Sequence, residues 1–411
     1  MEEEGSWLGS PAKVRKVTAP AEDDGEGWFS GVPDDVIRHI MSFLPTREAV
    51  RTCVVSRRWR DLWRSVPCID ADIIDFRRRD TDEEQYDEEG ELAFMLFMNK
   101  VMELRYPATI RTFRLRCILD LIEFYDDSSY YAKFEDINRW ISHAVQKQIQ
   151  VLDIVLFCDR LELDHSAFAC SYLKTIEFTN VILMKGFFEQ LEMGCPAVES
   201  LFLDECSIED ARISSKTLKV FTIVSSLFSS GGRITISTPN VTSLELWRPD
   251  NGIYVFDDMP FLMSSVLELN DVEDSRDFCQ NLRSLSAAKA LDVDYFGREL
   301  RMANNLQWYT RFNNLVSLTL CQWCLDANFY GLILFLQNSP KLEKLTLKLR
   351  MGTPKRIIAE LENRSFTSEH LTSVKVKCSR NHPQVNDVVD FFVNNGLTYA
   401  QIRIKYWKYW R

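Results

Sequence analysis

Residues 195–206 read CPAVESLFLDEC, and this stretch contains the unit that decides the fold. Val198, Leu201 and Leu203 follow the spacing apolar-x-x-apolar-x-apolar, and the last two alternate as the buried positions of a β-strand do. Cys206 follows at the turn that should end the strand. Because a unit this short cannot bury both of its faces alone, it requires similar units stacked on either side.

The same spacing recurs along the chain, and successive units start roughly 20 to 29 residues apart over most of the run. That interval is typical of leucine-rich repeats, which stack into a curved solenoid with a parallel sheet on its concave side. Between Val241 and Ala288 the interval is longer, and we expect a degenerate unit there around Val266, Leu267 and Leu269. The units are Ile110-Phe113-Leu115, Ile149-Leu152-Ile154, Leu173-Ile176-Phe178, Val198-Leu201-Leu203, Leu218-Phe221-Ile223, Val241-Leu244-Leu246, Ala288-Leu291-Val293, Leu315-Leu318-Leu320, Leu342-Leu345-Leu347 and Leu371-Val374-Val376.

Two further segments have the periodicity of amphipathic helices. We expect the first helix to begin at Leu92 and the second to cover about residues 136–148. The apolar positions that share one face are Leu92, Met95, Met98, Val101 and Met102 in the first helix, and Ile137, Ile141 and Val145 in the second.

Composition divides the chain into five segments. Residues 1–30 contain few apolar side chains, so we expect a disordered tail there. Residues 31–76 form a helical module, and 77–91 form a linker whose carboxylates repel one another. The repeat domain is placed at 92–369 and a terminal cap at 370–411. The predicted fold class is therefore α/β, with a small three-helix module followed by an irregular solenoid, or horseshoe, whose parallel strands line the concave face.

The 411-residue chain is 46% hydrophobic and carries a formal net charge of −11. A general nucleic-acid-binding protein normally has a basic face, so we expect no nucleic-acid partner. No apolar run approaches the length of a membrane span, and residues 1–20 lack the apolar block of a signal peptide. We therefore expect no membrane partner and a location in the nucleus, the cytoplasm or both. The basic cluster of Lys13, Arg15 and Lys16 is either a nuclear-import signal or ordinary solvated charge.

The sequence lacks the common motifs of catalysis. It contains no Gly-rich phosphate loop, no His-Glu-x-x-His motif and no Gly-x-Ser-x-Gly motif. Cys321 and Cys324 form a Cys-x-x-Cys pair, but no second pair follows, and Cys378 with His382 would complete a zinc site poorly. The eleven cysteines instead fit small buried side chains in a reducing compartment. We expect a non-catalytic protein without a metal or cofactor.

Residues 32–67 read VPDDVIRHIMSFLPTREAVRTCVVSRRWRDLWRSVP and have the pattern of three short helices. Pro33 suits a first helical turn, and Asp34 and Asp35 place negative charge at the positive N-terminus of the helix. The apolar positions of this helix recur at spacings of three and four until Pro45 ends it: Val36, Ile37, Ile40, Met41 and Leu44.

Two more helices complete this module, and we expect Thr46 and Ser56 to cap them. A module of about forty residues is too small to bury all of its apolar side chains, so some should remain for a partner. The alternative is that later parts of the chain cover them. The inner faces are Val50, Cys53 and Val54 in the second helix, and Trp59, Leu62 and Trp63 in the third.

This stretch resembles an F-box, with Val32 where that family usually has leucine. The resemblance implies docking onto the Skp-type adaptor of a cullin–RING ubiquitin ligase, and through the adaptor an association with the cullin and RING subunits. It rests on Pro33 with two following carboxylates, Ser42-Phe43-Leu44 before Pro45, Val50-Arg51-Thr52-Cys53, and Ser56-Arg57-Arg58-Trp59 before Leu62-Trp63. The residues to which it assigns adaptor contact are Val32, Pro33, Val36, Ile37, Ile40, Leu44, Pro45, Val50, Val54, Trp59, Leu62 and Trp63.

Over nearly its full length the chain resembles plant F-box/leucine-rich-repeat proteins, and the part from His370 to Ile404 resembles their strand-helix-strand terminal module, called FBD. The resemblance implies a substrate-recognition subunit of an SCF-type ligase, which presents an unknown target protein for ubiquitination and proteasomal degradation. The alternatives are a non-degradative scaffold and a repeat-only interaction protein whose F-box has decayed. Residues 404–411 alternate aromatic and basic side chains, which favours a terminal strand over a nucleic-acid stacking surface in so acidic a chain.

Overall fold

The computed structural model of the chain describes residues 31–54, 58–77, 87–105, 109–118, 127–157, 162–229, 232–248, 252–269, 275–296, 300–301, 310–350, 357–358, 366 and 369–407. The expected disordered tail, with Lys13, Arg15 and Lys16, lies outside the described residues. So do the predicted cap Ser56, most of the charged linker and residues 408–411.

The repeats form one long parallel sheet. Within the described residues this sheet has thirteen strands, and their spatial order follows the sequence. Each predicted unit lies on a strand, and all three of its apolar positions are buried. The strands are β1 (Cys68–Asp72), β2 (Thr112–Ile118), β3 (Val151–Phe157), β4 (Thr175–Thr179), β6 (Ser200–Asp204), β9 (Val220–Val224), β12 (Ser243–Trp247), β14 (Ser264–Leu269), β15 (Ala290–Tyr295), β17 (Ser317–Cys321), β18 (Lys344–Lys348), β20 (Ser373–Cys378) and β21 (Ile402–Tyr406).

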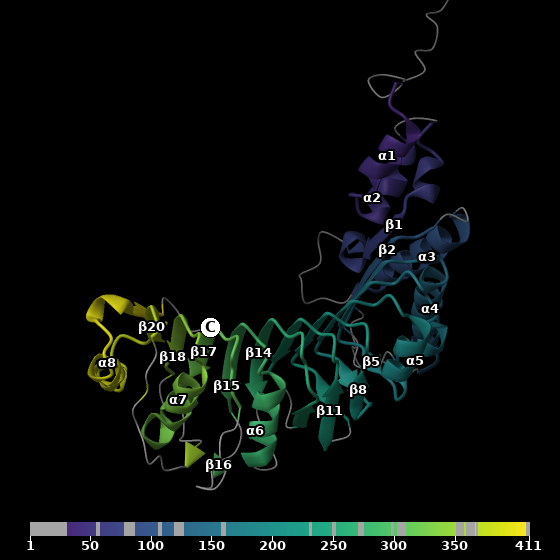
Figure 1. The fold of residues 1–411 in the computed structure, drawn as a ribbon. Coiled ribbons are helices and arrows are strands. Elements are labelled where there is room, and N and C mark those ends of the chain that lie inside the picture. The colour runs from purple at the N-terminus through teal and green to yellow at the C-terminus, as the bar shows by residue number, and fades with distance from the viewer. Residues whose placement is uncertain are drawn as a thin grey trace, which may run out of the picture.

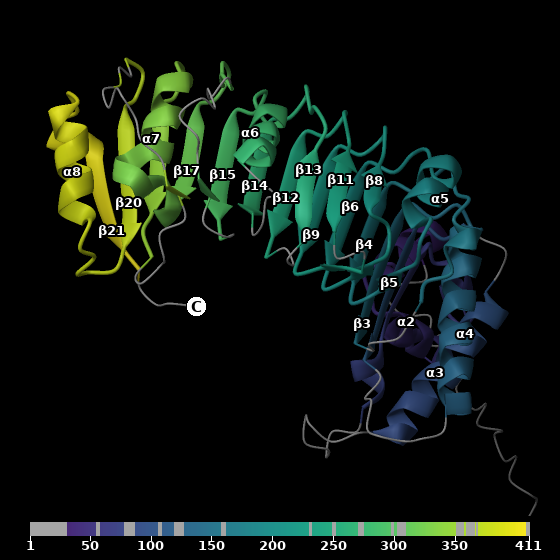
Figure 2. The ribbon, with the colours of Figure 1, turned by 90° about the horizontal axis from the view of Figure 1, so that it is seen from below.

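Helices and short strands cover the outer side of this sheet, and the long strands line its inner, concave side (Figures 1 and 2). The predicted α/β solenoid is thereby confirmed. The helices are α3 (Glu88–Leu104), α4 (Asp127–Val145), α5 (Phe187–Gly194), α6 (Ser275–Ser284), α7 (Asp326–Asn338) and α8 (Val385–Asn394), with 3-10 helices at η3 (Ile73–Phe76), η4 (His165–Ala167), η5 (Gln322–Leu325) and η6 (Tyr399–Gln401). The short strands are β5 (Ile182–Leu183), β7 (Ser207–Ile208), β8 (Arg212–Ser214), β10 (Leu227–Phe228), β11 (Arg233–Ser237), β13 (Ile253–Phe256), β16 (Leu300–Arg301) and β19 (Ile357–Ile358).

The register explains why the apolar spacing is so regular. Leu201 lies between Ile176 and Phe221 on the neighbouring strands, and equivalent residues follow two positions later. One unit escaped the sequence analysis: Val66, Ile69 and Ala71 have the same spacing, and β1 pairs in parallel with β2. Segment 31–76 therefore supplies both the helical module and the first strand of the sheet.

Helix α3 begins earlier than expected, inside the segment assigned to the charged linker. The carboxylate of Asp87 accepts a hydrogen bond from the Gly90 backbone N–H at 2.9 Å and so caps the first turn. The side chain of Leu92, predicted on the buried face, is exposed, whereas Met95 and Met98 are buried as expected. None of the helices among the described residues is long and apolar enough to cross a lipid bilayer.

The degenerate unit predicted around Val266 is present as strand β14. Its register places Ser265 beside Leu244 and Leu291, at the core position that leucine, phenylalanine or isoleucine occupies in most other units. Leu267 and Leu269 are buried as expected, while Val266 lies on the opposite, concave face. The Ser265 hydroxyl is buried and has no hydrogen-bond partner among the described residues.

We predict that Ser265→Ala raises the free energy of unfolding by about 1 kcal/mol, because it removes a buried hydroxyl without a partner. Urea denaturation midpoints of the two proteins measure the effect. The matched control is Ser264→Ala on the same strand, where the hydroxyl donates to Ser243 Oγ at 3.2 Å and its loss should bring no gain. A midpoint for Ser265→Ala at or below that of the unmodified chain would contradict the expectation.

Cys206 occupies the turn after β6, as its place in the repeat predicts. The side chain is fully buried, and Sγ lies 3.4 Å from each of the carbonyl oxygens of Phe178 and Asp204. Burial raises the pKa of the Cys206 thiol to about 12. Burial likewise raises the pKa of Cys321 and of Cys324, which lie at the end of β17 and in η5.

At pH 8 the Cys206 thiol is therefore almost entirely protonated in the folded protein. We expect iodoacetamide to alkylate Cys206 at least about 1000-fold more slowly in the native chain than in urea, since the thiolate is the reactive form. Mass-spectrometric mapping of labelled peptides over time measures both rates. Equal rates in the two states would disprove the buried thiol.

Candidate functional site

The N-terminal module consists of α1 (Asp34–Met41), α2 (Thr46–Arg51) and the 3-10 helices η1 (Thr52–Val54) and η2 (Leu62–Ser65). The first two helices lie where the sequence predicts them, and the third helical segment is the 3-10 helix η2. Thr46 does not cap α2, so that prediction is wrong. It is the first residue of the helix, and its hydroxyl accepts a hydrogen bond from the backbone N–H of Asp70 in β1 at 2.8 Å.

Three of the predicted contact residues lie in the interior of this module. Ile37, Leu62 and Trp63 are buried in the free chain and support the module surface from beneath, and their contact with a partner stays a prediction. Their inward orientation follows from packing against one another and against Val101 and Phe97 of α3. The buried cluster comprises Ile37, Met41, Leu62, Trp63, Val66 and Val101.

The remaining predicted residues reach the surface. Val36 is 45% exposed and Ile40 is 44% exposed, one helical turn apart on α1, beside the buried stripe of Ile37 and Met41. Val54, predicted on an inner face, is 86% exposed. Pro33 and Pro45 are also exposed, whereas Val32, Leu44, Val50 and Trp59 are half-buried.

Phe43 is a surface residue that the sequence analysis quoted but did not select. Its side chain is 75% exposed, and its ring lies 4.9 Å from the His39 ring in an edge-on arrangement. The i, i+3 spacing of Ile40 and Phe43 could have identified it. We call Val36, Ile40, Phe43 and Val54 the apolar surface of the module. So many large apolar side chains on so small a module are typical of a protein–protein interface.

Polar contacts hold this surface in place. Arg58 donates from Nε to Asp34 Oδ1 at 2.9 Å and also donates to the backbone carbonyl of Val32. These contacts tie the start of α1 to the segment that leads into η2. Both Arg58 and Asp34 are partly exposed to solvent, so this ion pair contributes only about 0.2–1 kcal/mol to stability.

Helix α3 joins the module to the repeats. Val101 packs into the module cluster, while Phe94 and Met98 pack into the solenoid core. Arg47 of α2 places its guanidinium 4.6 Å from the ring centre of Phe76. The module and the first repeat are therefore packed together, so the module that carries the apolar surface is held against the start of the sheet.

The concave face of the sheet is the second candidate binding surface, and its charge changes along the solenoid. At the N-terminal end Arg116 contacts Asp70 at 3.6 Å and Asp153 at 3.5 Å, so opposite charges offset each other. The central strands are acidic with interspersed aromatic rings, and the last strands are basic. The outward side chains are Glu177, Phe202, Asp204, Glu245, Trp247, Glu268, Asp292 and Asp294 in the centre, and Lys348, Lys375, Lys377, Arg403 and Lys405 at the end.

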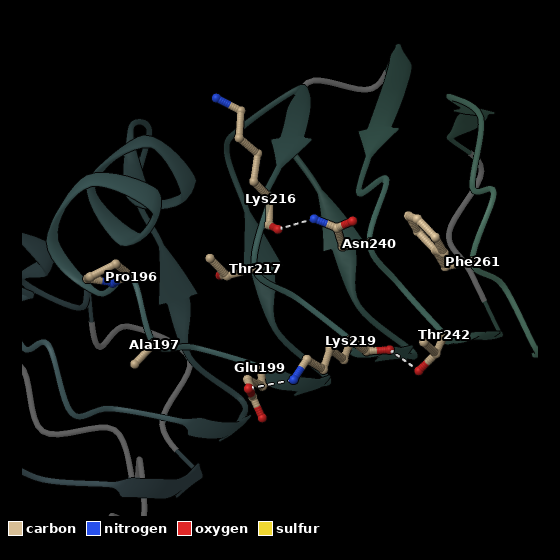
Figure 3. Close-up of a pocket in the computed structure, with 9 residues that line it drawn as sticks. All are labelled: Pro196, Ala197, Glu199, Lys216, Thr217, Lys219, Asn240, Thr242 and Phe261. Carbon is tan, nitrogen blue, oxygen red and sulfur yellow. Dashed lines mark hydrogen bonds and ion pairs between the residues drawn. The ribbon is translucent and has the colours of Figure 1, made fainter.

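A groove of about 510 Å³ lies where β6, β9 and β12 begin (Figure 3). Its charged groups are already paired, since Lys219 Nζ lies 2.6 Å from Glu199 Oε1 and lowers the pKa of that carboxyl. Asn240 donates to the Lys216 carbonyl at 2.6 Å, and Phe261 forms the far wall. The groove holds no histidine or cysteine. Among the residues that the structure describes, no group of three or more histidine, cysteine, aspartate or glutamate side chains could hold a metal ion.

Comparison with known proteins finds one matching domain and several similar plant proteins. Residues 29–70 match the model of the F-box domain. An F-box/LRR-repeat protein of Arabidopsis thaliana is 31% identical over 222 residues, which cover 47% of this chain and 64% of that protein. F-box/LRR-repeat protein 13 and an FBD-associated F-box protein of the same plant are 26% and 24% identical, and each alignment covers 85% of both chains. The strand-helix-strand order of β20, α8 and β21 matches the terminal module predicted from the sequence. The chain therefore contains an F-box domain, and over most of its length it is similar to plant F-box/leucine-rich-repeat and FBD-associated F-box proteins.

Proposed function

We propose that this F-box protein is the substrate-recognition subunit of an SCF-type cullin–RING ubiquitin ligase. Its F-box docks onto a Skp-type adaptor, and its repeats hold a target protein for ubiquitination and proteasomal degradation. The chain itself is non-catalytic, and the cullin and RING subunits reached through the adaptor supply the chemistry. The rate gain comes from holding the target close to the ligase, which raises its effective concentration.

The apolar surface of the F-box carries this proposal. Val36, Ile40 and Phe43 are exposed although the cluster beneath them is already closed by Ile37 and Trp63. No described part of the chain covers them, so the free surface supports a second subunit as the occupant. At about 0.8 kcal/mol per buried methylene, covering these side chains offers several kcal/mol to the complex.

Reconstitution tests the proposal in two stages. The full chain is co-expressed with a plant Skp-type adaptor and a cullin, and the complex is isolated by size-exclusion chromatography. We expect a stoichiometric complex. If the chain and the adaptor elute separately at micromolar concentration, the docking proposal is wrong.

The second stage separates a degradative receptor from a scaffold. Proteins that co-purify with the chain in plant cells are identified, and their abundance is compared with and without the gene for this chain. A receptor predicts that at least one bound protein accumulates several-fold when the chain is absent and when the proteasome is inhibited. Unchanged abundance of every bound protein would favour a non-degradative scaffold instead.

We also propose that the chain acts in the nucleus, the cytoplasm or both, with Lys13, Arg15 and Lys16 as an import signal. A fluorescent fusion in which all three are alanine should move toward the cytoplasm. An unchanged distribution would mean that the cluster is ordinary solvated charge.

A further inference from the structure

The last three strands of the sheet carry a dense group of cations on their concave face. The register places Lys348, Lys377 and Lys405 side by side on β18, β20 and β21. Two residues earlier along the strands, Lys375 on β20 lies beside Arg403 on β21. We call these five residues the basic patch. Neighbouring strands lie about 4.8 Å apart and alternate residues about 6.7 Å apart, so five positive charges fall within about 10 by 7 Å.

Like charges directly opposite one another on adjacent strands destabilise a sheet. Strands β18, β20 and β21 contain no carboxylate at all, and their sequences are KLTLK, SVKVKC and IRIKY. The pKa of Lys377 is lowered by burial and by the charges of Lys348 and Lys375. The charges in the patch therefore repel one another in the free protein.

Little in the described part of the chain offsets this charge. Lys348 Nζ lies 2.6 Å from Asp292 Oδ2, which accounts for one of the five cations. The other four, Lys375, Lys377, Arg403 and Lys405, form no ion pair with any described residue. This concentration of positive charge lies in a chain whose net charge is −11, so it is a local feature rather than a reflection of composition.

We propose that the basic patch binds an acidic segment of the target protein, with clustered aspartate, glutamate or phosphorylated side chains laid across β18, β20 and β21. The inference rests on the proposed function, because it names the chemistry of the target that the repeats hold. An extended peptide advances about 3.3 Å per residue, so three or four consecutive acidic residues span the patch. Several lysines can donate charge-assisted hydrogen bonds to such a cluster, and these are stronger than hydrogen bonds between neutral groups.

The acidic strands beyond β17 favour a protein segment over a nucleic acid. Asp292 and Asp294 on β15 pair with Lys348 and Arg350, while Glu268 on β14 and Glu245 on β12 carry negative charge further along the same concave face. A polyanionic backbone that continued along the solenoid would approach these last two carboxylates and be repelled. A peptide can place acidic side chains on the patch and neutral or basic ones beyond it.

Fluorescence anisotropy tests the inference with the full chain in complex with its adaptor. The probe is a labelled peptide of about twelve residues with the centre Glu-Glu-phosphoserine-Glu between Gly-Ser flanks. The reference peptide has Gln-Gln-Ser-Gln at its centre. We expect the acidic peptide to bind at least about tenfold more tightly at about 50 mM salt, with the difference shrinking as salt rises.

The decisive variant is Lys375→Gln with Lys377→Gln, in the middle of the patch. We expect it to bind the acidic peptide at least about tenfold more weakly and to melt at an equal or higher temperature, because repulsion is relieved. The control is Lys174→Gln with Lys289→Gln, two exposed lysines on other repeats, which should bind like the unmodified chain.

Three results would overturn the inference. They are equal affinity of the Lys375/Lys377 variant and the unmodified chain for the acidic peptide, equal affinity for the acidic and reference peptides, and tighter binding of a labelled oligothymidylate of the same length. Adaptor binding is measured in parallel. If the adaptor binds and the acidic peptide does not, the docking proposal stands and the patch inference fails. If the acidic peptide binds and the adaptor does not, the patch inference stands and the docking proposal fails.

Discussion

Ile40→Asp is expected to weaken binding of a Skp-type adaptor at least about 100-fold while the chain stays folded. Ile40 is 44% exposed on α1, so an aspartate there is hydrated in the free protein and costs little stability. In the complex the same carboxylate would be buried against apolar side chains without a partner. An uncompensated charge at an interface costs about 3–5 kcal/mol, and each 1.4 kcal/mol is a factor of ten in affinity. Isothermal titration calorimetry with purified adaptor measures the loss.

The matched control places the same charge on the same helix, away from the apolar surface. Arg38→Asp lies on the polar side of α1, where Arg38 pairs with Asp35 at 2.5 Å. It should change adaptor affinity by less than about threefold, since exposed pairs contribute little. Circular dichroism confirms that both variants keep their helices. Equal affinities for Ile40→Asp and Arg38→Asp would show that the apolar surface of the F-box is not the docking surface.

Phe94→Ala is expected to have the largest effect on stability, about 3–5 kcal/mol of the free energy of unfolding. Phe94 is fully buried in α3, and its ring lies 5.5 Å from that of Phe76 and 6.3 Å from that of Trp140 in edge-on arrangements. Truncation leaves a cavity where α3 meets α4 and the first strands. Guanidinium denaturation followed by tryptophan fluorescence measures the shift.

Leu96→Ala on the same helix is the control, because Leu96 is 59% exposed and its loss leaves no cavity. It should cost less than about 0.5 kcal/mol. Since α3 also supplies Val101 to the F-box cluster, the Phe94→Ala variant should lose adaptor binding at a lower denaturant concentration than the control does. Equal midpoints for the two variants would mean that α3 does not join the F-box to the repeats.

The repeat strands could be predicted from the sequence because their signal is local. In each unit the alternation of residues such as Leu318 and Leu320 decides which face is buried, whatever the neighbouring strands are. The unit at Ser265 was harder to align, because a serine occupies a core position and Val266 lies on the other face. The first strand was missed because Val66, Ile69 and Ala71 lie inside the stretch with the F-box pattern.

The F-box residues were predicted as a set, but not their orientations. Spacing places Val36, Ile37 and Ile40 on one broad apolar side of α1, and it cannot separate those that face a partner from those that face the interior. The packing of η2 and of Val101 against α1 makes that separation, burying Ile37 and leaving Val36 and Ile40 at the surface.

The kind of architecture, an F-box followed by stacked strand units, can be predicted from the amino-acid sequence because each motif consists of residues close together in the chain. Which side chains share a surface depends on how the strands pack. Lys348, Lys377 and Lys405 are each about one repeat apart, and they become neighbours through the order and register of β18, β20 and β21. Backbone hydrogen bonds between strands and the burial of one face of each strand fix that register, and it brings together residues that are far apart in the sequence.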